Sequence, residues 1–318
     1  MKPKQLKKGD AIGLVSPASA QYNRSWITRS VSALESWGYK VVLGKHAARK
    51  HGFFAGTDQE RSSDLNEMFR REDVDAVMAI DGGYGSARLL RYLDFDAIRQ
   101  NPKIFLGFSD ITILHLAINK LTGLTTFHGP GACSFPEEYL TAYTKAQLEK
   151  ALCAAEPVGE IALANPKKYI HAIGSGAVEA PIIGGNMSMI CTTLGTPYEI
   201  DVTGKVLFLE DVHLEPWYID HNMAHLMNAG KLAEAAGIVI GECRDCEPRT
   251  HQPAYYADTS IEDIFEEYLS PLGIPVLFGY PLGHTADIAT LPMGVMVRLD
   301  ADKKQFAVLE SGVQAANS

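Results

Sequence analysis

Three side chains that lie far apart in the sequence could together form a nucleophilic catalytic set: Ser109, Glu210 and His284. A serine hydroxyl is a weak nucleophile, so it needs an imidazole base, and the base needs a carboxylate that fixes its tautomer. A single histidine is more often structural than catalytic, and this chain has ten. Asp211 directly follows Glu210, so either carboxylate could act, or both could be solvated or cap a helix. These residue types point to nucleophilic catalysis and leave the carboxylate open.

Ser109 stands where a predicted buried strand, residues 104–108, turns into a helix that begins near Asp110. We expect a serine at so sharp a turn to be exposed, and backbone N–H groups at a helix N-terminus favour negative charge. This is the physics of a nucleophile elbow with its oxyanion hole, although Ile111 stands where the last glycine of G-x-S-x-G would be. The alternative is that Ser109 or Asp110 simply caps the helix.

A glycine-rich loop, Gly82-Gly-Tyr-Gly85, follows the predicted strand at residues 76–80. It matches neither G-x-G-x-x-G nor a P-loop, because no Gly-Lys-Ser/Thr follows it. The loop either supplies a backbone N–H group close to Ser109 or is an ordinary tight turn.

The elements that must position these groups follow different secondary-structure patterns in the two halves of the chain. In the first half, apolar strands alternate with helices, which predicts a parallel sheet covered on both faces, with ligands beyond the carboxyl ends of its strands. The second half has short strands, glycine turns and fewer helices, which predicts a mixed α/β domain. The stretch 156–168 has weak periodicity, so we predict domains at residues 1–158 and 159–318. The strands expected in the first half are residues 11–15, 41–43, 76–80, 104–108 and 125–128.

Composition excludes several classes of protein. The net charge is −9, and no basic block stands out, so we expect no nucleic-acid partner and no membrane surface. The chain has five cysteines, which is a sparse set for its length, and their number is odd. Such a set does not indicate a disulfide framework. Cys243-x-x-Cys246 allows a redox or zinc interpretation, but buried or loop thiols are the simpler one, and we expect no metal and no cofactor. With no signal-peptide run near the N-terminus, we expect a cytoplasmic protein.

The ordered set of segments resembles the LD-carboxypeptidases, serine peptidases that include muramoyl-tetrapeptide carboxypeptidases and microcin-immunity peptidases. The resemblance covers nearly the whole chain. Each matching segment is modest alone, and their combination is specific. The segments are Gly13-Leu-Val-Ser-Pro-Ala18, Gly82-Gly-Tyr-Gly-Ser-Ala-Arg-Leu-Leu90, Gly107-Phe-Ser-Asp-Ile-Thr112, Gly184-Gly-Asn-Met-Ser188, Leu207-Phe-Leu-Glu-Asp211, Glu215-Pro-Trp-Tyr218, Gly283-His284 and Leu291-Pro-Met-Gly294.

This resemblance implies a flavodoxin- or Rossmann-like N-terminal domain, a smaller mixed α/β C-terminal domain, an active site between them and a homodimer. It implies Ser109 as nucleophile, His284 as base and Glu210 as the carboxylate that orients the base. It also implies cleavage of an amide bond between an L-centre and a D-residue, such as release of D-alanine from a murein tetrapeptide in cell-wall recycling. A microcin-immunity-like activity on a peptidyl or aminoacyl nucleotide conjugate, or a non-enzymatic ligand-binding role, remains open.

The resemblance further implies an oxyanion hole built from the backbone N–H groups of Asp110 and a loop glycine, for which we choose Gly83. We expect Gly82 and Tyr84 to contact substrate. One residue departs from the family: many members have arginine before the double glycine, where this chain has Asp81. A charge reversal there could change how an anionic peptide is held.

Overall fold

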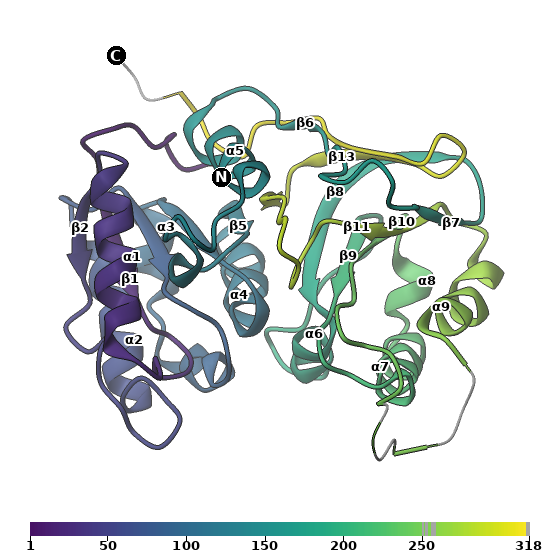
Figure 1. Ribbon diagram of the computed structural model, residues 1–318, viewed down its shortest axis with the longest axis horizontal. Coiled ribbons are helices and arrows are strands. Elements are labelled where there is room, and N and C mark those ends of the chain that lie inside the picture. Colours follow the sequence, from purple (N-terminus) through teal and green to yellow (C-terminus); the bar gives the residue numbers. More distant parts are fainter. Residues whose placement is uncertain (250, 252–253, 256–258, 316–318) are drawn as a thin grey trace.

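Two β-sheets organise the chain (Figure 1). The computed structural model describes residues 1–249, 251, 254–255 and 259–315. The first sheet has six strands in the order β12-β5-β4-β3-β1-β2, and the five from the first half are parallel. Their order, 2-1-3-4-5, is that of flavodoxin-like sheets. The strands are β1 (Ala11–Val15), β2 (Lys40–Leu43), β3 (Ala76–Ala79), β4 (Ile104–Gly107), β5 (Thr126–His128) and β12 (Leu291–Met293).

Alternation along the strands divides the apolar side chains of the first sheet between two faces. In and just after β3, Met78 and Ile80 pack in one core cluster, whereas Val77 and Ala79 pack in the other. The first cluster contains residues of α1 (Arg24–Ser36) and α5 (Ala142–Cys153). The second contains residues of α2 (Asp58–Arg70), the 3₁₀ helix η1 (Ser86–Tyr92), α3 (Phe95–Gln100) and α4 (Thr112–Thr122). The sheet is therefore covered on both faces, as the apolar strands predict.

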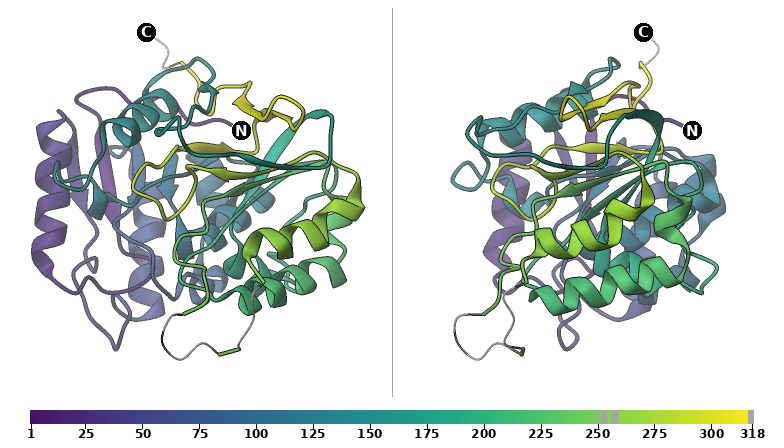
Figure 2. Two further views of the ribbon diagram at one scale, coloured as in Figure 1. Left: turned by 45° about the vertical axis from the view of Figure 1, so that its right-hand side comes forward. Right: turned by 90° about the vertical axis from the view of Figure 1, so that its right-hand side faces the viewer.

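The second sheet is mixed and has eight strands in the order β6-β14-β13-β8-β9-β10-β11-β7. Its central strands β8 to β11 are parallel, and the strands flanking them pair antiparallel. Figure 2 shows α7 and α9 together against one face of it. The strands are β6 (Gly159–Glu160), β7 (His171–Ile173), β8 (Ala177–Asn186), β9 (Val206–Glu210), β10 (Gly237–Gly241), β11 (Val276–Tyr280), β13 (Met296–Asp300) and β14 (Gln305–Val308), and the helices are α6 (Met187–Thr193), α7 (Pro216–Asn228), α8 (Lys231–Glu234) and α9 (Ile261–Leu269).

The two halves of the chain share structure. The edge strand β12 comes from the second half, yet it pairs antiparallel with β5 of the first sheet. Helix α4 lies between the sheets and contacts β8 and α6 (Figure 1). One core cluster of the described residues runs through both halves, from Leu6 to Val313. The fold class predicted from the sequence, a parallel α/β half followed by a mixed α/β half, is confirmed.

Several short elements escape the sequence patterns. Strand β7 has three residues and α3 has six, which is too short to show a period. The segment Ser86–Tyr92 is the 3₁₀ helix η1, which lacks the 3.6-residue period of an α-helix. Within the described ranges, no helix combines the length and the apolar character needed to cross a membrane.

Candidate active site

Ser109 occupies a strained turn between β4 and α4. Its φ is +61°, in the left-handed region that non-glycine residues rarely adopt. It opens the short 3₁₀ helix η2 (Ser109–Ile111), which leads into α4, and the residue is partly buried. A left-handed non-glycine residue costs roughly 1–2 kcal/mol, and such strain is typical of functional sites. The sharp strand-to-helix turn expected from the sequence is present.

The glycine loop packs directly against this turn. A Cβ atom on Gly82 would lie 2.9 Å from Ser109 Cβ and 3.3 Å from Ser109 Oγ. Any side chain at position 82 would therefore press on the proposed nucleophile. The close approach explains why glycine is required there.

Within the described part of the chain, the hydrogen bonds of the loop leave the N–H groups of Gly83 and Gly85 without an acceptor. The N–H of Gly82 donates to Asp81 Oδ1 at 2.8 Å, and the N–H of Tyr84 donates to Ser19 Oγ at 3.0 Å. Between them Gly83 has φ +102°, and within the described ranges its N–H has no hydrogen-bond acceptor. A Cβ on Gly83 would overlap Ser19 Oγ, so the loop can pass Ser19 only with glycine at this position. Of Gly83 and Gly85, Gly83 is the one that directly follows Gly82, which packs against Ser109.

Asp110 ties the loop to the nucleophile turn. Its buried carboxylate accepts a hydrogen bond from the backbone N–H of Ser86 at 2.7 Å. Its own backbone N–H belongs to the first turn of η2, where N–H groups have no partner within the helix. The Asp110 side chain therefore ties the end of the glycine loop, at Ser86, to the turn that carries Ser109.

His284 and Glu210 are in direct contact. His284 Nδ1 and Glu210 Oε2 are 2.7 Å apart, and the Glu210 carboxylate is fully buried at the end of β9. Burial opposes the charging of His284, but the hydrogen bond and charge of Glu210, with smaller contributions from Asp211 and Asp81, outweigh it. The pKa of His284 is therefore raised above its ordinary value.

Gly283 makes this contact possible. Its φ is +93°, and a Cβ at this position would overlap the Glu210 carboxylate. Only glycine lets the chain before His284 pass so close to Glu210. The glycine that precedes His284 in the sequence is therefore required for steric reasons.

Asp211 has a different task. Its carboxylate accepts hydrogen bonds from Asn186 Nδ2 at 3.1 Å, from the Ser188 N–H at 2.9 Å and from Ser188 Oγ at 2.7 Å. These contacts hold the start of α6 against the end of β9. Of the two neighbouring carboxylates that the sequence offers, the structure brings Glu210 to His284 and uses Asp211 to secure the β8–α6 turn.

The ring of Phe108, the residue before Ser109, packs against the His284 ring. The ring centroids of Phe108 and His284 are 4.8 Å apart, and Ser109 is the next residue along the chain. Among the described residues, the hydrogen bonds do not include one between Ser109 Oγ and the His284 ring. Catalytic hydrogen bonds often tighten only when substrate binds, so the lack of this bond does not argue against a nucleophile–base pair.

The arginines Arg88 and Arg244 differ in their surroundings. Arg88 Nε donates to both oxygens of Asp58, at 3.0 Å each. Arg244 Nε lies 3.3 Å from the Asp245 carboxylate, and its side chain is 62% exposed. Its backbone forms a β-bridge with Val212, two residues beyond Glu210. Of these two arginines, Arg244 is the one that lies beside the segment after β9.

Tyr84 forms part of an exposed aromatic surface. Its ring stacks on Phe54 at 5.7 Å and lies 5.6 Å from Phe53. Tyr84 and Phe53 are 56% and 63% exposed.

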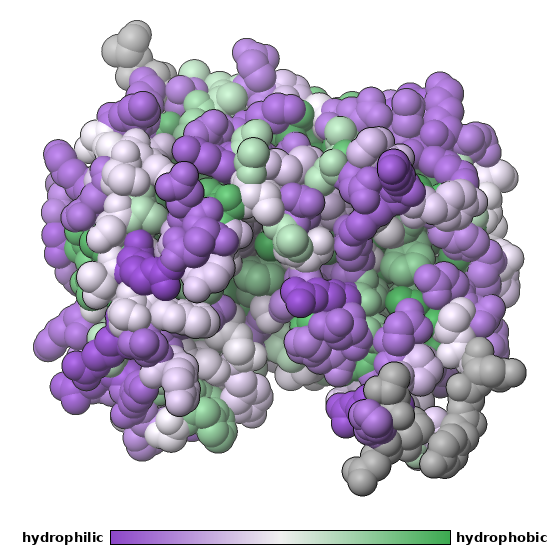
Figure 3. All heavy atoms as spheres, in the orientation of Figure 1, coloured by the Kyte–Doolittle hydropathy of each residue, from purple (hydrophilic) through white to green (hydrophobic). Residues whose placement is uncertain are grey.

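Figure 3 shows the surface hollowed between the two halves of the molecule, with hydrophobic residues visible in the hollow.

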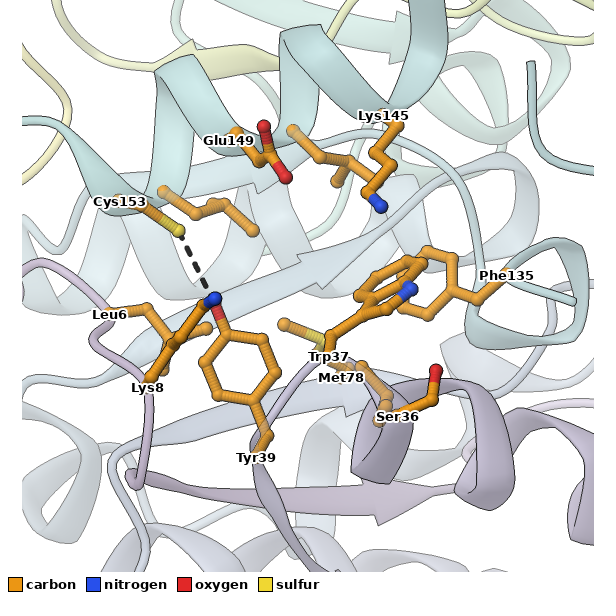
Figure 4. Close-up of a pocket in the computed structure, with 13 residues that line it drawn as sticks. Leu6, Lys8, Ser36, Trp37, Tyr39, Met78, Phe135, Lys145, Glu149 and Cys153 are labelled. Carbon is orange, nitrogen blue, oxygen red and sulfur yellow. Dashed lines mark hydrogen bonds between the residues drawn. The ribbon is translucent and has the colours of Figure 1, made fainter. Parts of the chain in front are cut away.

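A cavity of about 220 Å³ lies elsewhere, between α1, α5 and the N-terminal segment at Leu6 and Lys8 (Figure 4). Tyr39 Oη lies 3.5 Å from Cys153 Sγ in it, and Lys145 Nζ sits 5.3 Å above the Trp37 ring. None of the predicted site residues lines it. The cavity is therefore separate from the Ser109, Glu210 and His284 region.

Sequence reasoning missed two positioning residues. Ser19 holds the glycine loop, because its Oγ accepts from Tyr84 and its N–H donates to the Gly82 carbonyl at 3.3 Å. Gln21 Nε2 donates to Asp81 Oδ2 at 3.1 Å. The Ser-Pro-Ala-Ser turn after the first strand was the available signal, since the loops after β1 and β3 flank the point where the strand order reverses.

Comparisons with known proteins agree with this arrangement. Residues 12–129 match the LD-carboxypeptidase N-terminal domain, and residues 179–299 match the LD-carboxypeptidase C-terminal domain. The chain belongs to the LD-carboxypeptidase family. It is 38% identical to a probable murein peptide carboxypeptidase of Bacillus subtilis, over 98% of this chain and 95% of that one. It is 31% identical to the microcin C7 self-immunity protein MccF of Escherichia coli, over 96% and 94%.

Solved structures of LD-carboxypeptidase relatives show the same fold. MccF without ligand gives a TM-score of 0.86 at 29% identity, covering 99% of this chain and 100% of that one. The muramoyltetrapeptide carboxypeptidase of Oxalobacter formigenes gives 0.81 at 29% identity, covering 96% and 100%. MccF has also been solved in complex with aspartyl sulfamoyl adenosine. The family relatives thus include both peptidases named for murein peptides and a protein that binds a nucleotide conjugate.

Proposed function

We propose that this peptidase is a serine LD-carboxypeptidase that releases the terminal D-alanine of a murein tetrapeptide. The observation that carries the proposal is the buried contact between Glu210 and His284, beside a strained serine turn and an available loop N–H. The 38% identity to a murein peptide carboxypeptidase supports the substrate class.

In the proposed reaction Ser109 Oγ attacks the carbonyl carbon of the last peptide bond, and His284 takes its proton through Nε2. Nδ1 of His284 stays bonded to Glu210, which fixes the tautomer and stabilises the imidazolium. The N–H groups of Gly83 and Asp110 stabilise the oxyanion. His284 then protonates the leaving amine of D-alanine, and water hydrolyses the acyl-enzyme with His284 as base again.

A carboxypeptidase also needs a partner for the free carboxylate of its substrate. We assign this task to Arg244, because its side chain is exposed and its backbone forms a β-bridge with Val212, just after Glu210. The chain is acidic overall, with a net charge of −9, so a local cation must outweigh the global field for an anionic peptide. We assign Gly82 and the exposed ring of Tyr84 to substrate contact.

The proposal extends to organisation and setting. Residues 1–158 form the domain that carries Ser109, and residues 159–318 form the domain that carries Glu210 and His284. The protein acts as a homodimer in the cytoplasm, in the recycling of cell-wall peptides.

A second candidate is cleavage of a peptidyl or aminoacyl nucleotide conjugate, favoured by the similarity to MccF. One experiment separates the two: purified protein is incubated with a murein tetrapeptide and, separately, with an aminoacyl sulfamoyl adenosine, and products are identified by mass spectrometry. We expect loss of D-alanine from the tetrapeptide at the higher kcat/KM. Cleavage of the conjugate alone would favour the second candidate, and no cleavage of either would favour a ligand-binding protein.

A further inference from the structure

The cavity between α1, α5 and the N-terminal segment has an apolar floor. Its floor residues are all buried and come from separate parts of the first half of the chain. They are Leu6, Leu34, Met78, Phe135, Leu148 and Leu152. A concave site with such a floor is typical of the pockets that bind small molecules.

Aromatic rings form one side of the cavity. Trp37 and Tyr39 lie on the turn between α1 and β2 and are partly buried, and the Trp37 ring centroid is 5.1 Å from that of Phe135. An apolar cavity of about 150 Å³ can hold a benzene ring. The volume here, about 220 Å³, therefore suits one ring or a short aliphatic chain with a few further atoms.

Charged side chains of both signs stand at the rim of this apolar floor. Lys145 and Glu149 lie one turn apart on α5, Lys8 comes from the N-terminal segment, and all three residues are exposed. Figure 4 shows Lys145 and Glu149 hanging from α5 above the rings of Trp37 and Tyr39.

These charges are not used up by the protein itself. Among the described residues, the ion pairs include none that involves Lys8, Lys145 or Glu149. Lys145 Nζ instead lies 5.3 Å above the Trp37 ring. Lysine placed before glutamate at this spacing is also the weaker of the two orders for a helical pair. Both signs are therefore available to a ligand.

The pattern of charge fits a zwitterion better than a simple anion or cation. Side chains four residues apart on a helix are about 5–6 Å apart at Cβ, so one compact ligand can reach both. A carboxylate would lie between the ammonium groups of Lys145 and Lys8, and an ammonium group would pair with Glu149. An anion without the ammonium group would face Glu149 unpaired, and a cation without the carboxylate would face two lysines.

We propose that this cavity binds a free α-amino acid with an apolar side chain. The side chain lies among the rings of Trp37, Tyr39 and Phe135, and the α-carboxylate and α-ammonium groups pair with Lys145 and Glu149. A residue within a peptide chain carries neither charge, so the site selects free amino acids over peptides. The inference does not depend on the proposed function, because the cavity shares no residue with the Ser109, Glu210 and His284 region.

The test measures binding of L-phenylalanine to the full-length protein by isothermal titration calorimetry. We expect saturable binding with a Kd of about a millimolar or lower, which is usual for a ligand of this size. Two comparison ligands each lack one charge: 3-phenylpropanoate has no ammonium group, and 2-phenylethylamine has no carboxylate. Each should bind about fivefold more weakly than phenylalanine, as expected for the loss of a solvent-exposed ion pair.

Variants of the rim assign the two charges separately. Glu149→Gln should abolish the preference for phenylalanine over 3-phenylpropanoate, and Lys145→Gln should abolish the preference over 2-phenylethylamine. Lys150→Gln is the matched control, because Lys150 is an exposed lysine of the same helix that does not line the cavity. It should keep both preferences.

Three results would overturn the proposal. The first is the absence of saturable phenylalanine binding by folded wild type at several millimolar ligand. The second is a Glu149→Gln or Lys145→Gln variant that keeps both preferences. The third is a Lys145→Gln variant whose sedimentation coefficient differs from that of the wild type, because a second copy of the chain would then cover the cavity. Binding without any cleavage of tetrapeptide would refute the proposed function and leave this inference standing.

Discussion

The backbone N–H of Asn186 donates a buried hydrogen bond of 3.0 Å to Thr112 Oγ1. Thr112 is the first residue of α4, three residues after Ser109, and Asn186 pairs with Glu210 at the ends of β8 and β9. This bond therefore connects α4, which follows the Ser109 turn, to β8, the strand that pairs with the Glu210 strand β9. A Cβ on Gly185 would lie 2.5 Å from Thr112 Oγ1, so the approach also depends on glycine.

Replacement of Thr112 by valine should loosen this connection. Thr112→Val leaves the Asn186 N–H buried and unpaired, which costs about 1–3 kcal/mol of unfolding free energy. We expect a lower Tm together with a lower kcat. Thr112→Ser keeps the oxygen and should restore most of the kcat. Equal kcat values for the valine and serine variants would show that the bond does not position the site.

Gly283→Ala should separate His284 from Glu210, because the added Cβ overlaps the Glu210 carboxylate. Gly9→Ala is a matched control. Gly9 has nearly the same φ, +94° against +93°, but no atom within 4 Å of an added Cβ. Both variants carry the backbone strain of an alanine at positive φ, roughly 1 kcal/mol. Only Gly283→Ala should lose kcat, by at least about tenfold, and similar losses in both variants would assign the effect to strain alone.

The two neighbouring carboxylates should differ in what their loss affects. Glu210→Gln removes the charge that stabilises the His284 imidazolium, so kcat should fall by about a thousandfold or more with little change in Tm. Asp211→Asn disturbs the start of α6. It should therefore lower Tm more than Glu210→Gln does, and lower kcat less. Steady-state kinetics and thermal unfolding of both variants check this. A larger loss of kcat in Asp211→Asn would show that the wrong carboxylate has been assigned.

The pH dependence of kcat/KM follows from the raised pKa of His284. The base must be neutral to accept the serine proton, so activity should be lost as the pH falls through this pKa. Because Glu210 holds the pKa above the ordinary 6.5, the midpoint of the acid limb should lie above pH 6.5. In Glu210→Gln the remaining activity should have its acid limb at lower pH. An unchanged limb in that variant would contradict the assignment of the pair.

Much of this fold is readable from the sequence because its strands are apolar throughout. Ala11–Val15 and Ala76–Ala79 stand out as continuous apolar runs between helical segments, and the structure has strands there. The position of Ser109 at a strand-to-helix turn follows from the same pattern. Strand β12 could not be found this way, because it has three residues and its partner β5 is more than 150 residues away in the chain.

The residue pattern alone left Glu210 and Asp211 open; the family resemblance implies Glu210, and the structure brings that residue to His284. Successive side chains at the end of a strand point in different directions, so only one of the two can face His284. Which one does so depends on the register of β9 with β8 and on the path of the loop at Gly283. Neither is encoded in a local pattern. The roles of Ser19 and Thr112 were hidden for the same reason, because each acts on a residue that is distant in sequence.

The most direct test of the account is the conversion of a murein tetrapeptide by the wild type and by Ser109→Ala, followed by mass spectrometry. Ser134→Ala, at another partly buried serine of the first half, is the control for substitution itself. We predict that the wild type and Ser134→Ala release D-alanine, and that Ser109→Ala keeps its fold but loses at least about a thousandfold in turnover. Turnover by Ser109→Ala close to that of the wild type would contradict the assignment of Ser109 as the nucleophile.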